Sequence, residues 1–189
     1  MHDATWNELL DAHHRAKRPT RTAIPTHRPK AAILACSDAR VPPSVIFDQP
    51  AGALFVVRIA GNTASPTALA SLDYAVAELG IELLIVLGHT GCGAVQAAAA
   101  GTCAGHLAPI VEPIFETAMR TPEASVDEIV RRNVDTTVEA LILHTGPTGI
   151  AARTGQLEVR GAVYDLLSGH LESLPAQSLH PQSISTPAI

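Results

Sequence analysis

Aromatic side chains, cysteines and long apolar runs are all scarce in this sequence of 189 residues. Phe, Trp and Tyr make up 3% of the chain and hydrophobic residues 47%, so the core is expected to consist of Ala, Val, Leu and Ile. This composition argues against disorder and favours helices packed closely against a sheet. The three cysteines do not suggest a disulfide framework.

No apolar stretch approaches the roughly 20 residues that a membrane-spanning helix needs. Residues 1–8 lack the basic and apolar regions of a secretory signal, so we expect a cytoplasmic protein that interacts with no membrane. The 13 Lys and Arg against 18 Asp and Glu give a net charge of −5. Because the chain has no excess of basic residues to bind nucleic acid, we expect no nucleic-acid partner.

Short apolar segments alternate with segments of helical periodicity along the chain. Strands are predicted at 31–36, 54–59, 81–87 and 157–166. Helices are predicted at 5–17, 66–79, 92–100, 107–119 and 126–142. This alternation predicts one α/β domain over residues 31–174, with a mostly parallel central sheet flanked by helices. A helix and extended arm (1–30) precede the domain, and a flexible tail (175–189) follows it.

Local signals place some of the element boundaries. Ser65-Pro66 is typical of a helix N-cap followed by proline in the first turn. Ser125 and Glu128 form a capping-box pattern ahead of the last long helix. Val41-Pro42-Pro43 predicts an extended turn between the first two strands.

Two short motifs place cysteine and histidine at the ends of predicted strands. Cys36 closes the strand 31–35, and His89 and Cys92 follow the strand 83–87. Parallel strands would bring these three side chains to the same carboxyl edge of the sheet, where open α/β folds bind ligands. Two thiolates and one imidazole suit a catalytic zinc, because the fourth tetrahedral position stays open for water. The sequence therefore predicts a zinc site.

Asp38 and Arg40 follow Cys36 at intervals of two residues. In an extended segment, residues at i and i+2 point the same way, so these side chains are expected to converge. Arg40 would hold Asp38 as a carboxylate and fix its orientation. Asp38 then either accepts a hydrogen bond from zinc-bound water or becomes the fourth zinc ligand, and a purely structural pair is a third interpretation.

The remaining cysteine and most histidines are expected to lie outside this site. Nothing pairs Cys103 or His106 with the first motif, so both are interpreted as structural or surface residues. His13-His14 is interpreted as a solvated helix face. A cysteine nucleophile or redox protein is the alternative chemistry, but Cys36-x-x-x-Arg40 lacks the longer loop of a phosphate cradle, and Cys36 has no CxxC partner.

The two motifs resemble those of the β-class carbonic anhydrases. Cys36-Ser-Asp-Ala-Arg-Val41 matches the family's Cys-x-Asp-x-Arg motif, and Gly88-His-Thr-Gly-Cys-Gly-Ala-Val95 matches its His-x-x-Cys motif. The resemblance covers residues 27–172. It includes the familial stretches 46–48, 54–58, 60–62, 71–75 and 161–165.

The resemblance implies a C-terminal antiparallel edge strand and a homodimer that often pairs into a homotetramer. It also implies Cys36, His89 and Cys92 as Zn²⁺ ligands and Asp38 with Arg40 as the catalytic dyad, with Asp38 on zinc in a closed state. The implied activity is that of a carbonate dehydratase, a zinc lyase that converts CO₂ and water reversibly to bicarbonate and a proton.

One departure from the family lies ahead of the first motif. Many members carry a glutamine there that hydrogen-bonds bicarbonate from the partner subunit, and His27 occupies the corresponding stretch of this sequence. Val41, Phe47, Ala60 and Gly61 are predicted to form a small apolar pocket for CO₂.

Two other functions are compatible with the same motifs. A COS or CS₂ hydrolase would use the same residues, because these molecules are linear and electrophilic like CO₂. A non-catalytic bicarbonate-sensing or scaffold protein is the other alternative, and the intact Asp38 and Arg40 argue against it.

Overall fold

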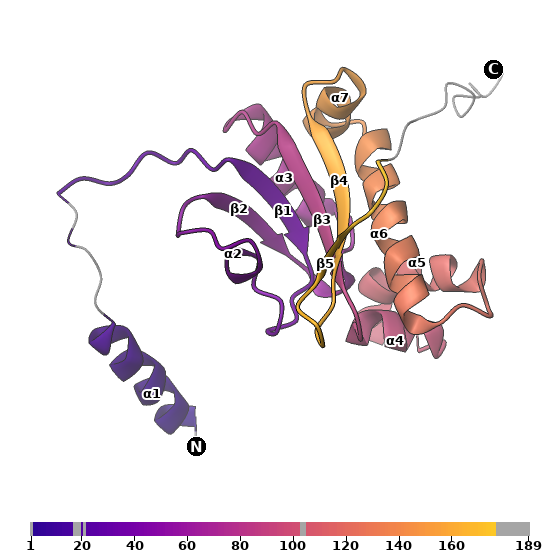
Figure 1. Cartoon of the computed structure of the whole chain (residues 1–189), viewed down its shortest axis with the longest axis horizontal. Helices are drawn as coiled ribbons and strands as arrows, with labels where there is room; N and C mark the ends of the chain where they lie inside the picture. Colours follow the sequence, from indigo (N-terminus) through magenta and orange to yellow (C-terminus); the bar gives the residue numbers. More distant parts are fainter. Residues whose placement is uncertain (1, 17–19, 21, 103–104, 177–189) are drawn as a thin grey trace.

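The computed structural model describes residues 2–16, 20, 22–102 and 105–176. In this part of the chain, five strands form one sheet in the order β2-β1-β3-β4-β5 (Figure 1). They are β1 (Ala31–Ala35), β2 (Leu54–Arg58), β3 (Leu83–His89), β4 (Glu158–Tyr164) and β5 (Leu171–Ser173). The first four are parallel and β5 pairs antiparallel with β4, which confirms the predicted fold class.

The five predicted helices are all present, with boundaries shifted by a few residues. They are α1 (His2–Arg15), α3 (Pro66–Ala77), α4 (Gly93–Ala99), α5 (Ala108–Met119) and α6 (Val126–Leu143). The sequence did not predict the short helices α2 (Pro43–Ile46) and α7 (Pro147–Arg153), or the 3₁₀ turns η1 (Ala60–Asn62) and η2 (Gly105–Leu107). Of the helices described, none combines the length and the apolar character needed to cross a membrane. Residues 177–189 of the predicted tail lie outside the described residues.

The cap signals act mostly as predicted. The Ala68 N–H donates to Ser65 Oγ at 3.3 Å, and the Glu128 N–H donates to Ser125 Oγ at 3.3 Å. The capping box is nevertheless only half formed, because the Glu128 carboxylate accepts a hydrogen bond from Arg132, one turn further along α6, at 2.8 Å. The predicted extended turn at 41–43 is wrong at its last residue: Pro42 is extended, but Pro43 begins α2, where a missing N–H has no cost.

Helix α6 packs very closely over β3 and β4. A Cβ atom added to Gly88 would lie 2.6 Å from the Val134 side chain, and one added to Gly161 would lie 2.9 Å from it. Val134 itself is fully buried. Both glycines therefore allow the helix to approach the sheet, and Gly88 does so directly ahead of His89.

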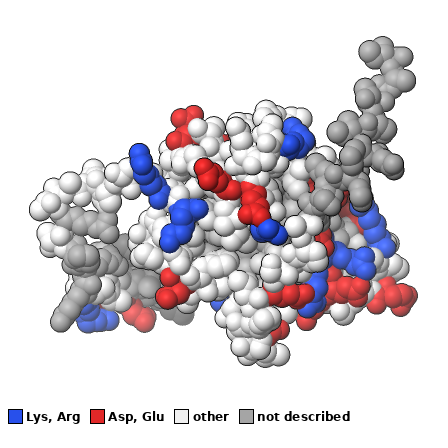
Figure 2. Space-filling model, turned by 45° about the horizontal axis from the view of Figure 1, so that its top comes forward, with Lys and Arg blue, Asp and Glu red and all other residues white. Residues whose placement is uncertain are grey.

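The two faces of the sheet are covered differently. Helices α3 and α6 pack on one face, with α7 against both helices, whereas Phe47 packs on the other face against the cluster of Ile33 and Ala35. Helix α1 stands apart from the sheet in Figure 1, and its Trp6 side chain is 63% exposed. On the face shown in Figure 2, basic and acidic side chains are interspersed over the body of the protein.

Asp73 of α3 ties the turn between α6 and α7 to the rest of the fold. Its Oδ1 accepts the Thr148 N–H at 2.9 Å, and its Oδ2 lies 2.9 Å from His144 Nε2. Gly146 passes close by, since a Cβ there would lie 2.4 Å from Asp73 Oδ2. Burial tends to raise the pKa of Asp73, but the Thr148 N–H and His144 lower it more, so the net shift is downward.

Asp73→Ala is expected to lower the free energy of unfolding by about 1–3 kcal/mol at neutral pH, because the Thr148 N–H loses its partner. The pKa of Asp73 is lower in the folded state, so its contribution is present above the unfolded pKa of about 3.9 and is lost as pH falls through the folded value. Urea unfolding at pH 7 and at pH 3 measures this. Glu78→Ala, at an exposed position of the same region, is the control, and an equal loss in both variants would contradict the prediction.

Candidate active site

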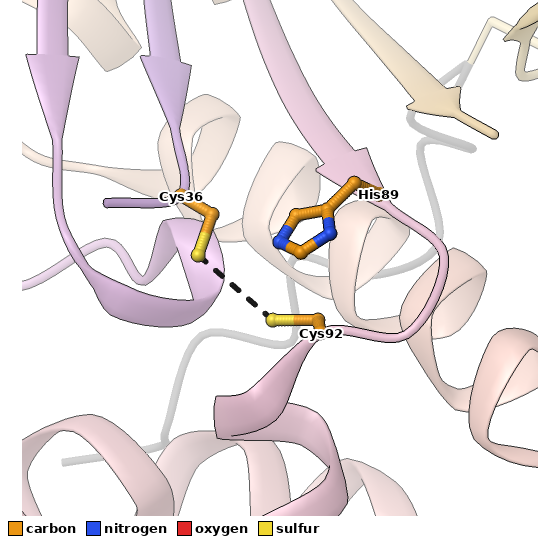
Figure 3. Close-up of side chains that lie close together, drawn as sticks. All are labelled: Cys36, His89 and Cys92. Carbon is orange, nitrogen blue, oxygen red and sulfur yellow. Dashed lines mark hydrogen bonds between the residues drawn. The ribbon is translucent and has the colours of Figure 1, made fainter. Parts of the chain in front are cut away.

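The predicted ligand residues meet at the carboxyl edge of the sheet. Cys36 follows β1, His89 is the last residue of β3, and Cys92 is the N-cap of α4 (Figure 3). All three are buried, and one candidate ligand atom from each lies within 4.8 Å of the others. The predicted convergence is therefore confirmed as geometry. The one difference is that β3 continues through His89, which pairs with Tyr164 of β4.

The imidazole of His89 has one nitrogen available for a ligand. Its Nδ1 lies 3.0 Å from the carbonyl oxygen of Thr90. A carbonyl only accepts hydrogen bonds, so Nδ1 carries the proton and Nε2 the lone pair. Among the described residues, the buried Nε2 has no hydrogen-bond partner. A buried polar atom without a partner is costly, and coordination to a metal ion would satisfy it.

The two thiols lie within hydrogen-bond distance of each other. Their sulfur atoms are 3.9 Å apart. A hydrogen bond from Cys92 lowers the pKa of Cys36 to about 4, and the adjacent Cys36 sulfur raises the pKa of Cys92 above its ordinary value. The backbone N–H groups at the start of α4 lower the pKa of Cys92, as its helix-terminal position predicts, but Cys36 outweighs them. A divalent cation fits this donor set, and binding it would displace the remaining proton.

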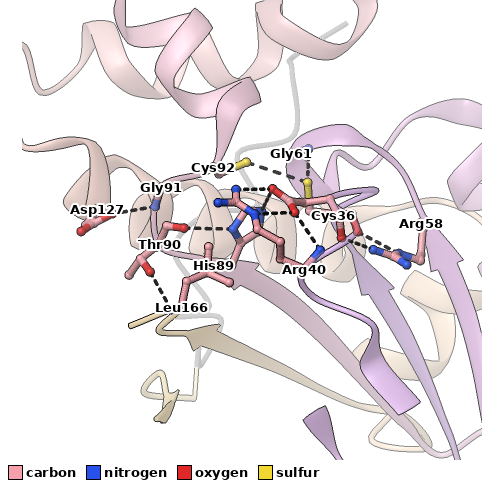
Figure 4. A network of polar contacts seen from close by, with 11 residues as sticks. Cys36, Arg40, Arg58, Gly61, His89, Thr90, Gly91, Cys92, Asp127 and Leu166 are labelled. Carbon is pink, nitrogen blue, oxygen red and sulfur yellow. Dashed lines mark hydrogen bonds and ion pairs between the residues drawn. The ribbon is translucent and has the colours of Figure 1, made fainter. Parts of the chain in front are cut away.

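The loop between His89 and Cys92 is anchored from two sides (Figure 4). The N–H of Gly91, whose φ is 65°, donates to Asp127 Oδ1 of α6 at 3.1 Å. Thr90 Oγ1 accepts the Leu166 N–H at 3.0 Å from the turn after β4. Sequence reasoning missed both anchors. The acidic Asp127 in the first turn of α6 was the one sequence signal for the first anchor. It did not single out this role, because acidic residues are favoured there by the helix dipole alone.

Asp38 and Arg40 form a close ion pair beside the ligand cluster. Arg40 donates from its backbone N and from Nε to Asp38 Oδ1, both at 2.9 Å, and from Nη2 to Oδ2 at 2.6 Å. Arg40 thereby holds the pKa of Asp38 far below its usual range. Asp38 Oδ2 is 3.9 Å from His89 Nε2. The pairing arises in a turn closed by the Val41 N–H and the Asp38 carbonyl at 3.2 Å, not in the extended segment that was predicted.

Arg58, at the end of β2, is a further residue that sequence reasoning missed. Its Nε donates to the Cys36 carbonyl at 2.9 Å, and its Nη2 donates to the Asp38 carbonyl. These bonds fix the backbone on both sides of residue 37. They connect positions about twenty residues apart, so no local sequence signal reveals them.

The other candidate residues lie in different places. His27 stacks on Phe55 with ring centroids 6.2 Å apart, and the ring centroids of Phe55 and Tyr74 are 6.3 Å apart. His106 is exposed in η2, as predicted, and Cys103 lies outside the described residues. His13-His14 is exposed on α1.

The predicted CO₂-pocket residues are divided between two regions. Gly61 adjoins the sulfur of Cys36, since its N–H lies 3.4 Å from Sγ. Val41 belongs to the same buried cluster as Cys36, whereas Phe47 packs on the opposite face of the sheet. A separate open cavity of about 450 Å³ lies beside the site, and Arg40 is among the residues that line it.

Comparison with known proteins places this fold and site in a family. The carbonic anhydrase family model matches residues 31–171. A β-carbonic anhydrase structure from Aspergillus fumigatus matches with a TM-score of 0.73 and 28% identity, over 93% of this chain and 88% of that chain. This chain belongs to the β-class carbonic anhydrases. Carbonic anhydrase 2 of Mycobacterium tuberculosis is 35% identical to it over an alignment of 185 positions, which covers 88% of this chain and 89% of that protein.

A second solved structure shares the architecture of this β-carbonic anhydrase. It comes from a study of two tetrameric β-carbonic anhydrases of Sordaria macrospora, and it matches with a TM-score of 0.72 and 27% identity. The match covers 79% of this chain and 82% of that chain. This β-carbonic anhydrase is thus a metal-binding carbonate dehydratase, and hydration of CO₂ is the general reaction of its family.

Proposed function

We propose that this enzyme hydrates CO₂ reversibly to bicarbonate and a proton, and that its metal is zinc, held by Cys36, His89 and Cys92. The unpartnered Nε2 of His89, buried beside two thiols, is the observation that carries the proposal. Zinc accepts thiolate and imidazole ligands at tetrahedral angles and leaves one position open in catalytic sites. When bound, zinc acts as a Lewis acid that makes water nucleophilic near neutral pH.

Asp38 is proposed to orient the reacting water. Arg40 keeps its carboxylate ionised and fixes its direction through the three hydrogen bonds between them, so the carboxylate is an acceptor with a set position. Asp38 Oδ2 lies near His89 Nε2 and therefore faces the ligand cluster. In a closed state, the same carboxylate is proposed to become the fourth ligand. Val41 and Gly61 are proposed as part of the apolar surface against which CO₂ lies.

The chain is proposed to act as a homodimer or homotetramer in the cytoplasm. Two observations support assembly. The apolar residues Trp6 and Leu9 of α1 are 63% and 62% exposed, and the related Sordaria macrospora enzymes are tetrameric. His27, which stacks on Phe55 at the surface, is proposed to contribute to the site of a partner subunit.

Stopped-flow CO₂ hydration across pH, with zinc measured on the same sample, tests the proposed function. The expected result is equimolar zinc and rapid hydration. A zinc-loaded chain that does not hydrate CO₂ would favour a bicarbonate-sensing role. Faster turnover of COS or CS₂ than of CO₂ would favour the hydrolase. Absence of any bound metal would contradict the proposed centre.

A further inference from the structure

A chain of two buried hydrogen bonds connects α6 to the sulfur of Cys36. Asn133 of α6 is 4% exposed, and its Nδ2 donates to the carbonyl oxygen of Gly61 at 2.9 Å. The N–H of the same Gly61 lies 3.4 Å from Cys36 Sγ, within the range of a hydrogen bond to sulfur. Figure 4 shows Gly61 directly beside the Cys36 sulfur. Gly61 of η1 therefore accepts a hydrogen bond from α6 at its carbonyl oxygen, and its N–H donates one to the sulfur of the candidate ligand Cys36.

The conformation of η1 is one that the backbone does not adopt without support. Gly61 has a φ of 68° and Asn62 a φ of 47°, so two successive residues are left-handed. Such a conformation at a non-glycine residue costs free energy and persists only where surrounding contacts hold it. The space is also limited, since a Cβ at Gly61 would lie 2.4 Å from the Ile114 side chain of α5. The bond from Asn133 is the polar contact that holds the Gly61 carbonyl on the side facing α6.

We propose that Asn133 is a positioning residue for Cys36: it holds η1 so that the Gly61 N–H points at the sulfur and withdraws charge from the thiolate. The inference rests on the proposed zinc centre. Two thiolates formally neutralise a divalent zinc ion, which weakens it as a Lewis acid. A hydrogen bond to one sulfur reduces the charge that this ligand donates, so the ion stays more electrophilic. Asn133 thereby acts on the metal through Gly61 and Cys36 without touching either metal or substrate.

Asn133→Leu in the full chain loaded with Co²⁺ tests this role. Leucine has the same branching as asparagine but no N–H, so Gly61 loses its hydrogen bond, although the two methyl groups are bulkier than the amide. The sulfur-to-cobalt charge-transfer band is expected to move to lower energy, because the thiolate becomes more electron-rich.

Thr137→Val is the matched control. Thr137 is a buried polar residue one turn further along α6, and its substitution leaves the Asn133–Gly61 bond in place. Its charge-transfer band should lie at the same energy as that of the wild type. If Asn133→Leu does not fold, Asn133→Ala replaces it, with near-UV circular dichroism as the test of folding. A folded Asn133 variant with an unchanged band would overturn the inference, whereas a wild type without any sulfur-to-cobalt band would overturn the zinc centre itself.

Discussion

Asp38→Asn is expected to lower kcat for CO₂ hydration by about 10²–10⁴-fold, the range attributed to a well-placed acid or base group, while the metal content stays unchanged. The side chain keeps its size, but the amide is neutral and its nitrogen cannot accept a hydrogen bond. Arg40, which makes three hydrogen bonds with this carboxylate, loses its ionic partner. The decisive measurement is stopped-flow hydration with metal analysis on the same preparation.

Asp11→Asn is the control for this substitution. It makes the same chemical change at an exposed position of α1, and it should leave kcat unaltered. Full activity in Asp38→Asn would rule out the assigned role.

Because the pKa of Asp38 is far below its usual range, protonation of this carboxylate does not explain a loss of activity just below neutral pH. Such a loss with zinc retained would instead support Asp38 as the fourth ligand of a closed state.

Cys92→Ser is expected to remove most of the bound zinc and, with it, nearly all CO₂ hydration. Serine is similar in size but has an alcohol that does not ionise near neutral pH, so two of the three ligands remain. Zinc per chain after dialysis against a weak chelator measures the effect. Cys103→Ser is the control, since the sequence gives Cys103 no partner in the site, and that variant should retain its zinc.

The same ligand set predicts how metal retention depends on pH in the wild type. The pKa of Cys92 is raised by the adjacent Cys36, so this thiol carries a proton that must leave when zinc binds. Acid favours the protonated thiol, and zinc affinity should therefore fall as pH falls. Retention of zinc by Cys92→Ser, with an unchanged pH dependence, would show that Cys92 is not a ligand.

The ligand cluster was predictable from sequence because its members lie at strand ends. Parallel pairing of β1 with β3 fixes where those ends meet, so Cys36 and His89 needed only the correct strand assignment. The protonation of the cluster was not predictable. A cysteine at a helix start is expected to ionise readily, yet Cys92 does the opposite, because Cys36 lies beside it from a position 56 residues earlier.

The residues that support the cluster were also beyond local pattern analysis. Arg58 reaches Cys36 across 22 positions, Asp127 reaches Gly91 across 36, and Asn133 reaches Gly61 across 72. Each is a common residue type in an unremarkable context, and each has an ordinary alternative interpretation as a surface or helix-terminal residue. Their contacts form only when the helices pack on the sheet. Neither the periodicity nor the spacing of residues in the sequence indicates such contacts.

The close packing of α6 over Gly88 and Gly161 determines how the candidate site unfolds locally. Val134 fills the space above these glycines, and on the same helix Asp127 bonds to Gly91 and Asn133 to Gly61, the two backbone segments beside the candidate ligands. A rigid helix cannot release one segment and keep the other. The segments at Gly91 and Gly61 should therefore become exposed together, in one cooperative local unfolding event. Its free energy should equal that of separating α6 from the sheet.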